Sequence, residues 1–432
     1  MAKKAVDAGA VTFGGSYTSA LREKLGARMG KSSSLLGAHN AIPGPELPST
    51  ALAYLENKPT LLCGGRIQEI TGAPECCKST YLYELIRVVL AAGGEAILFD
   101  TENKVAVEIL KGVLHHNPGY MSRVSVIPAT TYEQWMDGLT ECVRTLRSAF
   151  ESGEMQVPFM LAVDSLNAAP PEKLVDEIKE QGHSAQDFPR LPKQLSKDFS
   201  VLADLMADLP FSFVYTNHCK KQVGSMVPGA EYRLGGRAVE YYETLSVKLS
   251  PAARESKFVR ADCTGRRLKM KTLKNGLGPE REIEIVIYFR NLLNPNYGPE
   301  HPDEDKYRLD VMFDWGETDM RFLTSIISGS RKDFSKASRD ALQDILDLHV
   351  VSRQNSATWV WSSSLGIPEK DPLPFGEAGK VYFQDRTLRQ AVHDELKIKR
   401  QPVYRAGDNY RQVIENYVAA QNKLYEEKNN NE

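Results

Sequence analysis

Short apolar runs alternate with amphipathic stretches from about residue 60 to residue 290, and this alternation restricts the fold more than any other feature. Buried strands are predicted at residues 66–71, 95–100, 159–164 and 211–216, and helices at residues 79–92 and 132–151. Strands joined through helices form right-handed βαβ units, which give a mostly parallel sheet with helices on both faces. Apolar runs at residues 245–249 and 268–273 are predicted to extend this sheet. The expected fold class is therefore α/β.

The segments on either side of this alternation differ from it in composition. Residues 1–50 contain a predicted helix at 16–29, then a Ser-rich stretch and a linker rich in Pro and Gly. After about residue 318 the alternation gives way to a predicted helix at 333–348, a segment with Trp359 and Trp361, and a helical stretch from Arg386. We therefore predict an N-terminal helix and linker (1–50), which either docks on another part of an assembly or is an untidy terminus, a core (51–315) and a small, mostly helical C-terminal domain with a charged tail (316–432).

Composition excludes several classes of protein. The formal net charge is −2 over 432 residues, so nucleic-acid binding would need a local basic surface. The six cysteines form no CxxC pair, which argues against a disulfide framework or a zinc site. Because no apolar run approaches the length of a membrane span, we expect an intracellular, cytoplasmic protein without a membrane partner.

Residues 72–80 (GAPECCKST) lie between a predicted strand and a predicted helix, which is where a phosphate-binding P-loop occurs. Backbone N–H groups and the helix N-terminus would face a bound phosphate. Lys78 is placed to neutralise the β- and γ-phosphates, and the Ser79 hydroxyl to bind Mg²⁺. The usual pattern, GxxxxGK[ST], has glycine where this chain has Cys77, so alone the segment is equally compatible with a chance Lys-Ser at a helix start. The candidate nucleotide-binding residues are Gly72, Ala73, Pro74, Glu75, Cys76, Cys77, Lys78, Ser79 and Thr80.

Three other strand ends offer polar side chains suited to phosphate chemistry. Asp164 ends a buried strand and could hold Mg²⁺ through water, and Glu102 follows another strand and could deprotonate an attacking water. Asn217 and His218 follow a third strand and could sense the γ-phosphate. Each has an ordinary structural explanation: a turn aspartate, an acid at a helix N-terminus, a structural histidine. Together with Lys78 they favour hydrolysis of ATP with Mg²⁺.

The order of these motifs resembles the RecA family of recombinases, over roughly residues 16–290. The resemblance is carried by GGRIQEITGAPECCKSTY, LFDTEN, FMLAVDSLNA, VYTNHC, LGGRAVEYY and KMKTLKNG. It implies that Glu102 is the catalytic glutamate, that Asp164 is the metal-side acid, and that His218 replaces the glutamine of an Asn-Gln switch. It also implies that Lys274 reaches the nucleotide of a neighbouring subunit, although Gly276 stands where a second such lysine would be.

Within this family the chain resembles the phage UvsX branch more than the bacterial protein. The C-terminal segment and the bulky residue at Cys77 carry that likeness. The resemblance also implies that the helix at 16–29 packs on the next protomer, so that the chain forms a helical filament with the nucleotide at the subunit interface. It suggests loader and single-strand-binding proteins as accessory partners in a phage-infected bacterial cell.

Two basic segments occupy the positions of the family's DNA-binding loops. A lone lysine is usually a solvated surface charge, but a basic loop directly after Asn217 and His218 favours contacts to DNA phosphates. The first segment spans residues 180–197 and the second 219–234, and both are expected to be loops. The candidate DNA-binding residues are Arg190, Lys193 and Lys197 in the first, Lys220, Lys221 and Arg233 in the second, and Gly235, Gly236 and Arg237 directly after it.

These features favour an ATP-dependent recombinase that forms filaments on single-stranded DNA and pairs it with a homologous duplex. Two alternatives use the same core. One is a hexameric helicase motor, which the short N-terminal segment argues against. The other is a filament scaffold that binds ATP with little hydrolysis, which the Cys77 and His218 replacements keep open.

Overall fold

The computed structural model covers the predicted core and most of the C-terminal segment. It describes residues 42–103, 105, 107–166, 168–181, 190–207, 209–221, 231–233, 237–252, 256–260, 263–298, 305–347, 350–355, 358–361 and 373–430. The predicted oligomerisation helix at 16–29 lies outside the described residues.

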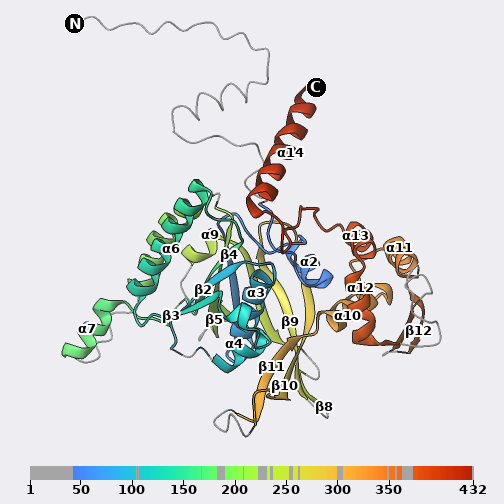
Figure 1. The fold of residues 1–432 in the computed structure, drawn as a ribbon, viewed down its shortest axis with the longest axis horizontal. Coiled ribbons are helices and arrows are strands. Elements are labelled where there is room, and N and C mark those ends of the chain that lie inside the picture. Colours follow the sequence, from blue (N-terminus) through green and yellow to red (C-terminus); the bar gives the residue numbers. More distant parts are fainter. Residues whose placement is uncertain are drawn as a thin grey trace, which may run out of the picture.

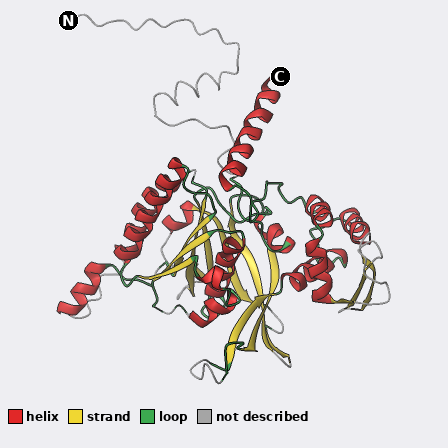
Figure 2. Cartoon of the chain, in the orientation of Figure 1, coloured by secondary structure: helices red, strands yellow, loops and turns green. Residues whose placement is uncertain are grey.

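A large mixed sheet forms the centre of the molecule (Figures 1 and 2). The six strands from β7 to β3 run parallel, and β9, β10 and β11 continue the sheet in antiparallel fashion. Two short strands pair at the side: β6 (Glu231–Arg233) with β5, and β8 (Lys257–Arg260) with β9. The order across the sheet is β11 (Tyr307–Phe313), β10 (Glu282–Leu293), β9 (Cys263–Asn275), β7 (Glu243–Pro251), β1 (Arg66–Gly72), β5 (Phe211–Lys221), β4 (Phe159–Asp164), β2 (Glu95–Asp100) and β3 (Val124–Pro128).

Helices cover both faces of the parallel part, as the alternation predicted. Along β4, Met160 and Ala162 face a hydrophobic cluster shared with α3 (Lys78–Ala91), whereas Leu161 and Val163 face a second cluster. That second cluster is completed by α6 (Tyr132–Ser152) and α8 (Arg190–Met206). The period-two alternation of buried apolar side chains therefore separates the two layers. This arrangement confirms the α/β fold class. The shorter helices are α2 (Thr50–Glu56), α4 (Val107–Val113), α5 (Pro118–Met121), α7 (Glu172–Gln181) and α9 (Arg237–Tyr242).

The described part of the C-terminal segment is mostly helical and packs against the core. A small antiparallel sheet, not predicted from the sequence, lies beside its helices (Figure 1). Leu342, Tyr382 and Leu388 belong to the same buried cluster as the core strands. Its elements are α10 (Trp315–Ile327), α11 (Lys336–Asp347), β12 (Val350–Asn355), β13 (Thr358–Trp361), β14 (Leu373–Pro374), α12 (Phe375–Gln384), α13 (Arg386–Glu395) and α14 (Tyr410–Asn430).

A buried carboxylate joins this segment to the start of the core. Asp319 of α10 accepts hydrogen bonds from the Ser49 hydroxyl at 2.6 Å and from the backbone N–H groups of Thr50 and Ala51 at 3.0 and 2.8 Å. Ser49 is the N-cap residue of α2, so Asp319 completes the cap of a helix distant in sequence. Among the described residues, we find no helix with the length and apolar character needed to cross a membrane.

Candidate nucleotide and DNA site

The carboxyl ends of four adjacent parallel strands bring the predicted catalytic residues together. Strand β1 pairs with β5 so that Gly72 lies opposite His218 and Thr71 opposite Asn217. Strand β2 pairs with β4 so that Asp100 lies opposite Asp164. Since β5 and β4 are also neighbours, the P-loop, the Asn-His pair, Asp164 and the residues after β2 share one edge of the sheet. Ligands of open α/β sheets bind at this edge.

Two positions of the P-loop segment, Gly72 and Cys77, have backbone conformations that favour glycine. A Cβ on Gly72 would lie 2.4 Å from the Leu249 carbonyl oxygen, so the β1–β7 approach requires glycine there. Cys77 is the N-cap residue of α3 and has φ = 56°, the left-handed conformation that glycine adopts without cost. Lys78 Nζ donates to the Ala73 carbonyl at 2.8 Å, across the loop. Burial lowers the pKa of Lys78, and nearby acidic groups, among them Asp164, raise it.

Asp164 and Ser79 form the part of the site that could hold a divalent cation. Burial raises the pKa of Asp164, while hydrogen bonds from Thr216 and Ser79 lower it. A hydroxyl and a carboxylate are oxygen ligands of the kind that Mg²⁺ prefers. Within the described part of the chain no group of three His, Cys, Asp or Glu side chains could hold a metal. The Ser79 hydroxyl and the Asp164 carboxylate are nevertheless ligands that fit Mg²⁺.

Glu102 is held by one side chain that follows β4 and by one side chain of β5. Ser165 Oγ donates to Glu102 Oε1 at 2.8 Å, and His218 Nε2 lies 3.0 Å from the same oxygen. The Glu102 side chain is 27 % exposed and that of His218 is 32 % exposed, so both remain accessible to a ligand. The arrangement suits a carboxylate that accepts a proton from water, with an imidazole controlling its direction.

Arg266 contacts the P-loop from β9, and no pattern in the sequence predicted this contact. Its Nη1 donates to the Glu75 carbonyl at 2.7 Å and lies 3.6 Å from the Cys77 sulfur. Burial raises the pKa of the Cys77 thiol, and Arg266 lowers it. Arg266 therefore supports the outer side of the loop at the position where glycine is replaced.

The described ends of the second predicted DNA segment form two paired strands, which together we call the hairpin, and the first of them begins at the nucleotide site. Strand β5 continues beyond Asn217 and His218 to Lys221, and the chain returns as β6, with Cys219 opposite Arg233. Lys220 and Lys221 lie in the outgoing strand, but their side chains are outside the described residues. Gly235 and Gly236 are also outside them, as is the side chain of Arg237, the first residue of α9. The expectation of a loop over 219–234 was wrong at both ends, because backbone pairing extends both strands.

Comparison with curated proteins finds sequences that are similar to this chain. The chain is 24 % identical to the RecA protein of Borrelia hermsii over 226 residues, which are 52 % of this chain and 58 % of that protein. It is 24 % identical to the RecA protein of Thermus aquaticus over 233 residues, 54 % of this chain and 63 % of the relative. This chain is distantly similar to RecA. No family model matches it. The chain spans about three-fifths of the length of these relatives. The similarity supports the RecA family and a RecA-type core.

The first predicted DNA segment differs from the expectation of a RecA-like loop. Helix α8 begins at Arg190, so Arg190, Lys193 and Lys197 belong to a helix, and the loop prediction was wrong for the second half of 180–197. Lys197 is exposed, whereas the side chains of Arg190 and Lys193 lie outside the described residues. The amphipathic pattern of residues 195–206, with Leu195, Phe199 and Leu202 buried, was the missed signal.

Lys274 lies on β9 and is engaged within its own chain. Its Nζ donates to the Glu240 carbonyl and lies 3.4 Å from the Tyr241 carbonyl, both near the C-terminal end of α9. A cation at this end of a helix is favourable. Contact with a RecA-like neighbour's nucleotide stays a prediction.

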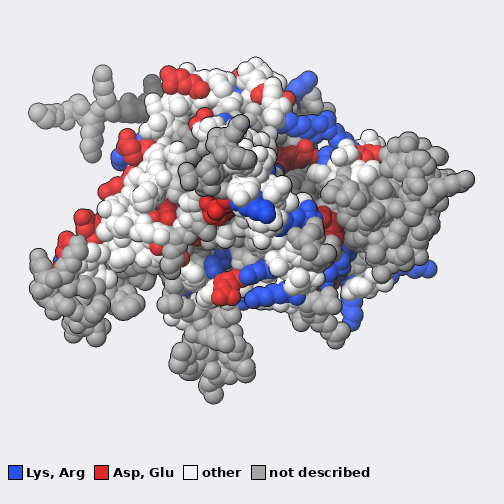
Figure 3. Space-filling model, turned by 60° about the horizontal axis from the view of Figure 1, so that its bottom comes forward, with Lys and Arg blue, Asp and Glu red and all other residues white. Residues whose placement is uncertain are grey.

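The chain has a local concentration of positive charge despite its net charge of −2. In Figure 3 the molecule is turned so that the bottom of Figure 1 comes forward. Lys and Arg side chains gather over the centre and right of this view. Strand β9 alone contains Arg266, Arg267, Lys269, Lys271 and Lys274. A local basic surface of this kind is what a protein without overall positive charge needs for nucleic acid.

Proposed function

We propose that this chain is an ATP-dependent recombinase that forms filaments on single-stranded DNA and pairs that DNA with a homologous duplex. The observation that carries the proposal is the register of β1, β5, β4 and β2, which gathers Lys78, Ser79, Asp164, Glu102 and the Asn217-His218 pair at one edge. The distant similarity to RecA supports the same activity.

The reaction would be attack of water on the γ-phosphorus of ATP. Glu102 accepts a proton from that water, the bond from the γ-phosphorus to the bridging oxygen breaks, and ADP and phosphate leave. Lys78 neutralises charge on the phosphate oxygens, and the N–H groups at the start of α3 bind them. Ser79 and Asp164 would hold Mg²⁺, which supplies further neutralisation of the phosphates.

DNA would bind at the hairpin that extends β5. Lys220 and Lys221 follow Asn217 and His218 in the same strand, so a phosphate contact at the hairpin and a γ-phosphate contact at its base act on one continuous element. Two ligands that favour the same position of that element increase each other's affinity. ATP binding would thereby strengthen DNA binding, and DNA would stimulate hydrolysis.

Further parts of the proposal concern assembly and biological setting. The helix at 16–29 would pack on the next protomer and so build the filament. Cys77 in the P-loop favours a place near the phage UvsX branch and hence a phage-infected bacterial cell. Loader and single-strand-binding proteins would then be the accessory partners.

Phosphate release with and without single-stranded DNA tests the proposal. DNA should stimulate release, and Lys78→Ala and Glu102→Gln should abolish the stimulated rate. Lys111→Ala and Glu108→Gln are matched controls, because this exposed pair on α4 lies 44 % and 67 % accessible to solvent. No release above background would favour an ATP-binding scaffold, and closed rings in negative-stain images with an ATP analogue would favour a helicase.

A further inference from the structure

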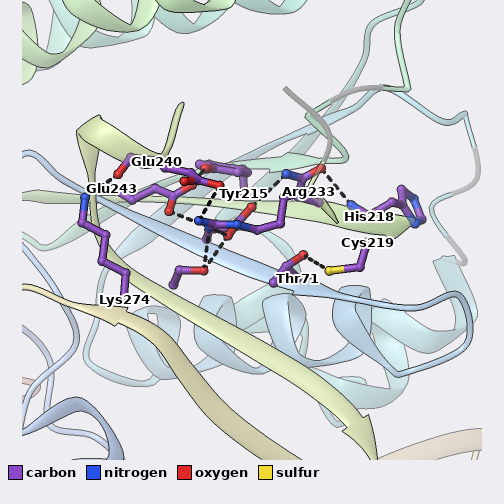
Figure 4. A network of polar contacts seen from close by, with 11 residues as sticks. Thr71, Tyr215, His218, Cys219, Arg233, Glu240, Glu243 and Lys274 are labelled. Carbon is purple, nitrogen blue, oxygen red and sulfur yellow. Dashed lines mark hydrogen bonds and ion pairs between the residues drawn. The ribbon is translucent and has the colours of Figure 1, made fainter. Parts of the chain in front are cut away.

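The side chain of Arg233 turns away from solvent into a cluster of carboxylates. It comes from β6, where Tyr232 is 47 % exposed while the Arg233 side chain is only 14 % exposed, as expected for alternating residues of a strand. Nη1 of Arg233 contacts Glu69 and lies 2.8 Å from Glu243, and Nη2 lies 3.1 Å from Glu240 (Figure 4). A guanidinium engaged in this way is turned away from the DNA phosphates that a basic loop residue would contact.

The carboxylates that hold Arg233 belong to the centre of the sheet. Glu69 lies on β1 and Glu243 at the start of β7, and each side chain is 1 % exposed. Ser246 of β7 donates to Glu69 and accepts from Arg233 at 3.0 Å. Burial and the neighbouring Glu69 raise the pKa of Glu243 to about 7, and Arg233 lowers it. The guanidinium therefore compensates two carboxylates that are otherwise costly to bury.

Glu69 contacts both strands of the hairpin. Its Oε1 accepts from Asn217 Nδ2 at 2.8 Å, and its Oε2 faces Arg233. Asn217 stands on β5 at the nucleotide edge, and its Oδ1 accepts from the backbone N–H of His218 at 2.8 Å. One buried side chain on the P-loop strand is thus bonded to the outgoing strand β5 at the nucleotide edge and to the returning strand β6.

We propose that Arg233 is a positioning residue that, through Glu69 and Glu243, fixes the DNA-binding hairpin to β1 and β7 and so couples the nucleotide site to DNA affinity. This inference rests on the proposed function, because it assigns the route by which ATP and DNA affect each other. It replaces the sequence-based expectation that Arg233 contacts DNA directly.

The two roles of Arg233 differ in what a substitution changes. Loss of a phosphate contact weakens DNA binding equally with and without nucleotide and reduces the salt slope of log affinity by about one. Loss of a positioning contact to Glu69 and Glu243 leaves that slope unchanged. It removes the gain in DNA affinity that nucleotide produces, which is about 5- to 150-fold for typical allosteric couplings.

The experiment measures binding of a labelled oligothymidylate by anisotropy, with and without a slowly hydrolysed ATP analogue, over a series of salt concentrations. The full chain is compared with Arg233→Lys, Arg233→Met and Glu69→Gln, and with Arg144→Met as a matched control at an arginine that is 65 % exposed on α6. We expect the nucleotide-dependent gain to fall at least about fivefold in the three cluster variants, with an unchanged salt slope, and to persist in Arg144→Met. Lysine keeps the charge and the fold but cannot bridge three carboxylates.

Two results would overturn the inference. A retained nucleotide-dependent gain in Arg233→Lys and Glu69→Gln would show that the cluster carries no coupling. A salt slope lowered by about one in Arg233→Met, with the gain retained, would assign Arg233 to the phosphates. In both cases the unsubstituted chain still shows the gain, so the proposed function stands. If the unsubstituted chain shows no gain, the proposed function fails and the inference fails with it.

Discussion

The imidazole of His218 and the carboxylate of Glu102 meet at 3.0 Å, although β4 separates β5, which carries His218, from β2, which precedes Glu102. Ser165, which follows β4, donates to the same carboxylate oxygen at 2.8 Å. Side chains from β5 and from the end of β4 therefore set the orientation of the candidate base. A γ-phosphate that draws His218 toward itself would change the hydrogen bonding of Glu102, which links nucleotide binding to the base.

Substitution of His218 tests this control of the base. His218→Ala is expected to lower the DNA-stimulated rate of ATP hydrolysis about 10- to 100-fold, because a misdirected carboxylate loses much of its effect. His218→Gln should retain more activity, since an amide can still donate to Glu102. Steady-state phosphate release measures both rates. Equal activity of His218→Ala and the unsubstituted chain would contradict the role.

Cys77→Gly should be tolerated or beneficial in the P-loop. Glycine adopts φ = 56° without the steric cost of a Cβ, so the free energy of unfolding should rise by up to about 1 kcal/mol. ATP turnover should be kept or increased, because the N–H groups that face the phosphate stay in place. Chemical denaturation and phosphate release check the two effects. Cys77→Ala is the control, because it keeps the strained conformation and loses the thiol contact.

Arg266→Met should weaken nucleotide binding more than catalysis. The Arg266 side chain supports the Glu75 carbonyl and the Cys77 thiol but has no described contact with Glu102. We expect KM for ATP to rise about 5- to 10-fold, equivalent to one charge-assisted hydrogen bond, with little change in kcat. Lys269→Met on the same strand, where Lys269 forms an exposed pair with Glu282, should leave both constants unchanged. A fall in kcat with constant KM would contradict a purely positioning role.

His393 should make stability depend on pH. Burial and the nearby Arg389 lower its pKa from 6.5 to about 4, against the smaller opposite effects of Glu46 and Asp394. The unfolded chain binds this proton near pH 6.5 and the folded chain only near pH 4. The contribution of neutral His393 to the free energy of unfolding is therefore complete above pH 6.5 and is lost as the pH falls toward 4.

Between pH 7 and pH 5 the unsubstituted chain should therefore lose about 2 kcal/mol more stability than His393→Gln, which cannot titrate. Urea unfolding at the two pH values measures this difference. Comparison of the two chains cancels the titration of other buried acids. An equal loss in both would show that His393 is protonated in the folded chain.

The parallel half of the sheet and its helices were predictable because their sequence signals are local. Residues 95–100 and 159–164 are strands with the predicted bounds, since each is a short apolar run between polar segments. The edge that gathers the candidate site residues followed from the same strands, because parallel strands end at one side of a sheet. Strands β10 and β11 were missed, although the alternation of exposed Glu282 and Glu284 with buried Ile283 and Ile285 is a strand signal for β10.

The contacts that position the loops were not predictable, for a physical reason. Glu69 lies in a strand that was correctly predicted, but a single charged residue in an apolar run does not indicate which side chain it will contact. The direction of Arg233 depends on the register of β6 against β5, which no local pattern specifies. Contacts such as Arg266 to the P-loop join residues that are 191 positions apart, and only the tertiary fold brings them together.

The cap that Asp319 supplies to α2 has a consequence for how the chain is made. Ser49 and Asp319 are separated by 270 positions, so during synthesis α2 cannot acquire this part of its cap until the ribosome has passed α10. Chains generally fold from the N-terminus as they emerge, yet here α2 depends on a helix that is made much later. This part of the core should thus reach its final form only after α10 has left the ribosome, and a nascent chain stalled before α10 would have an incompletely capped α2.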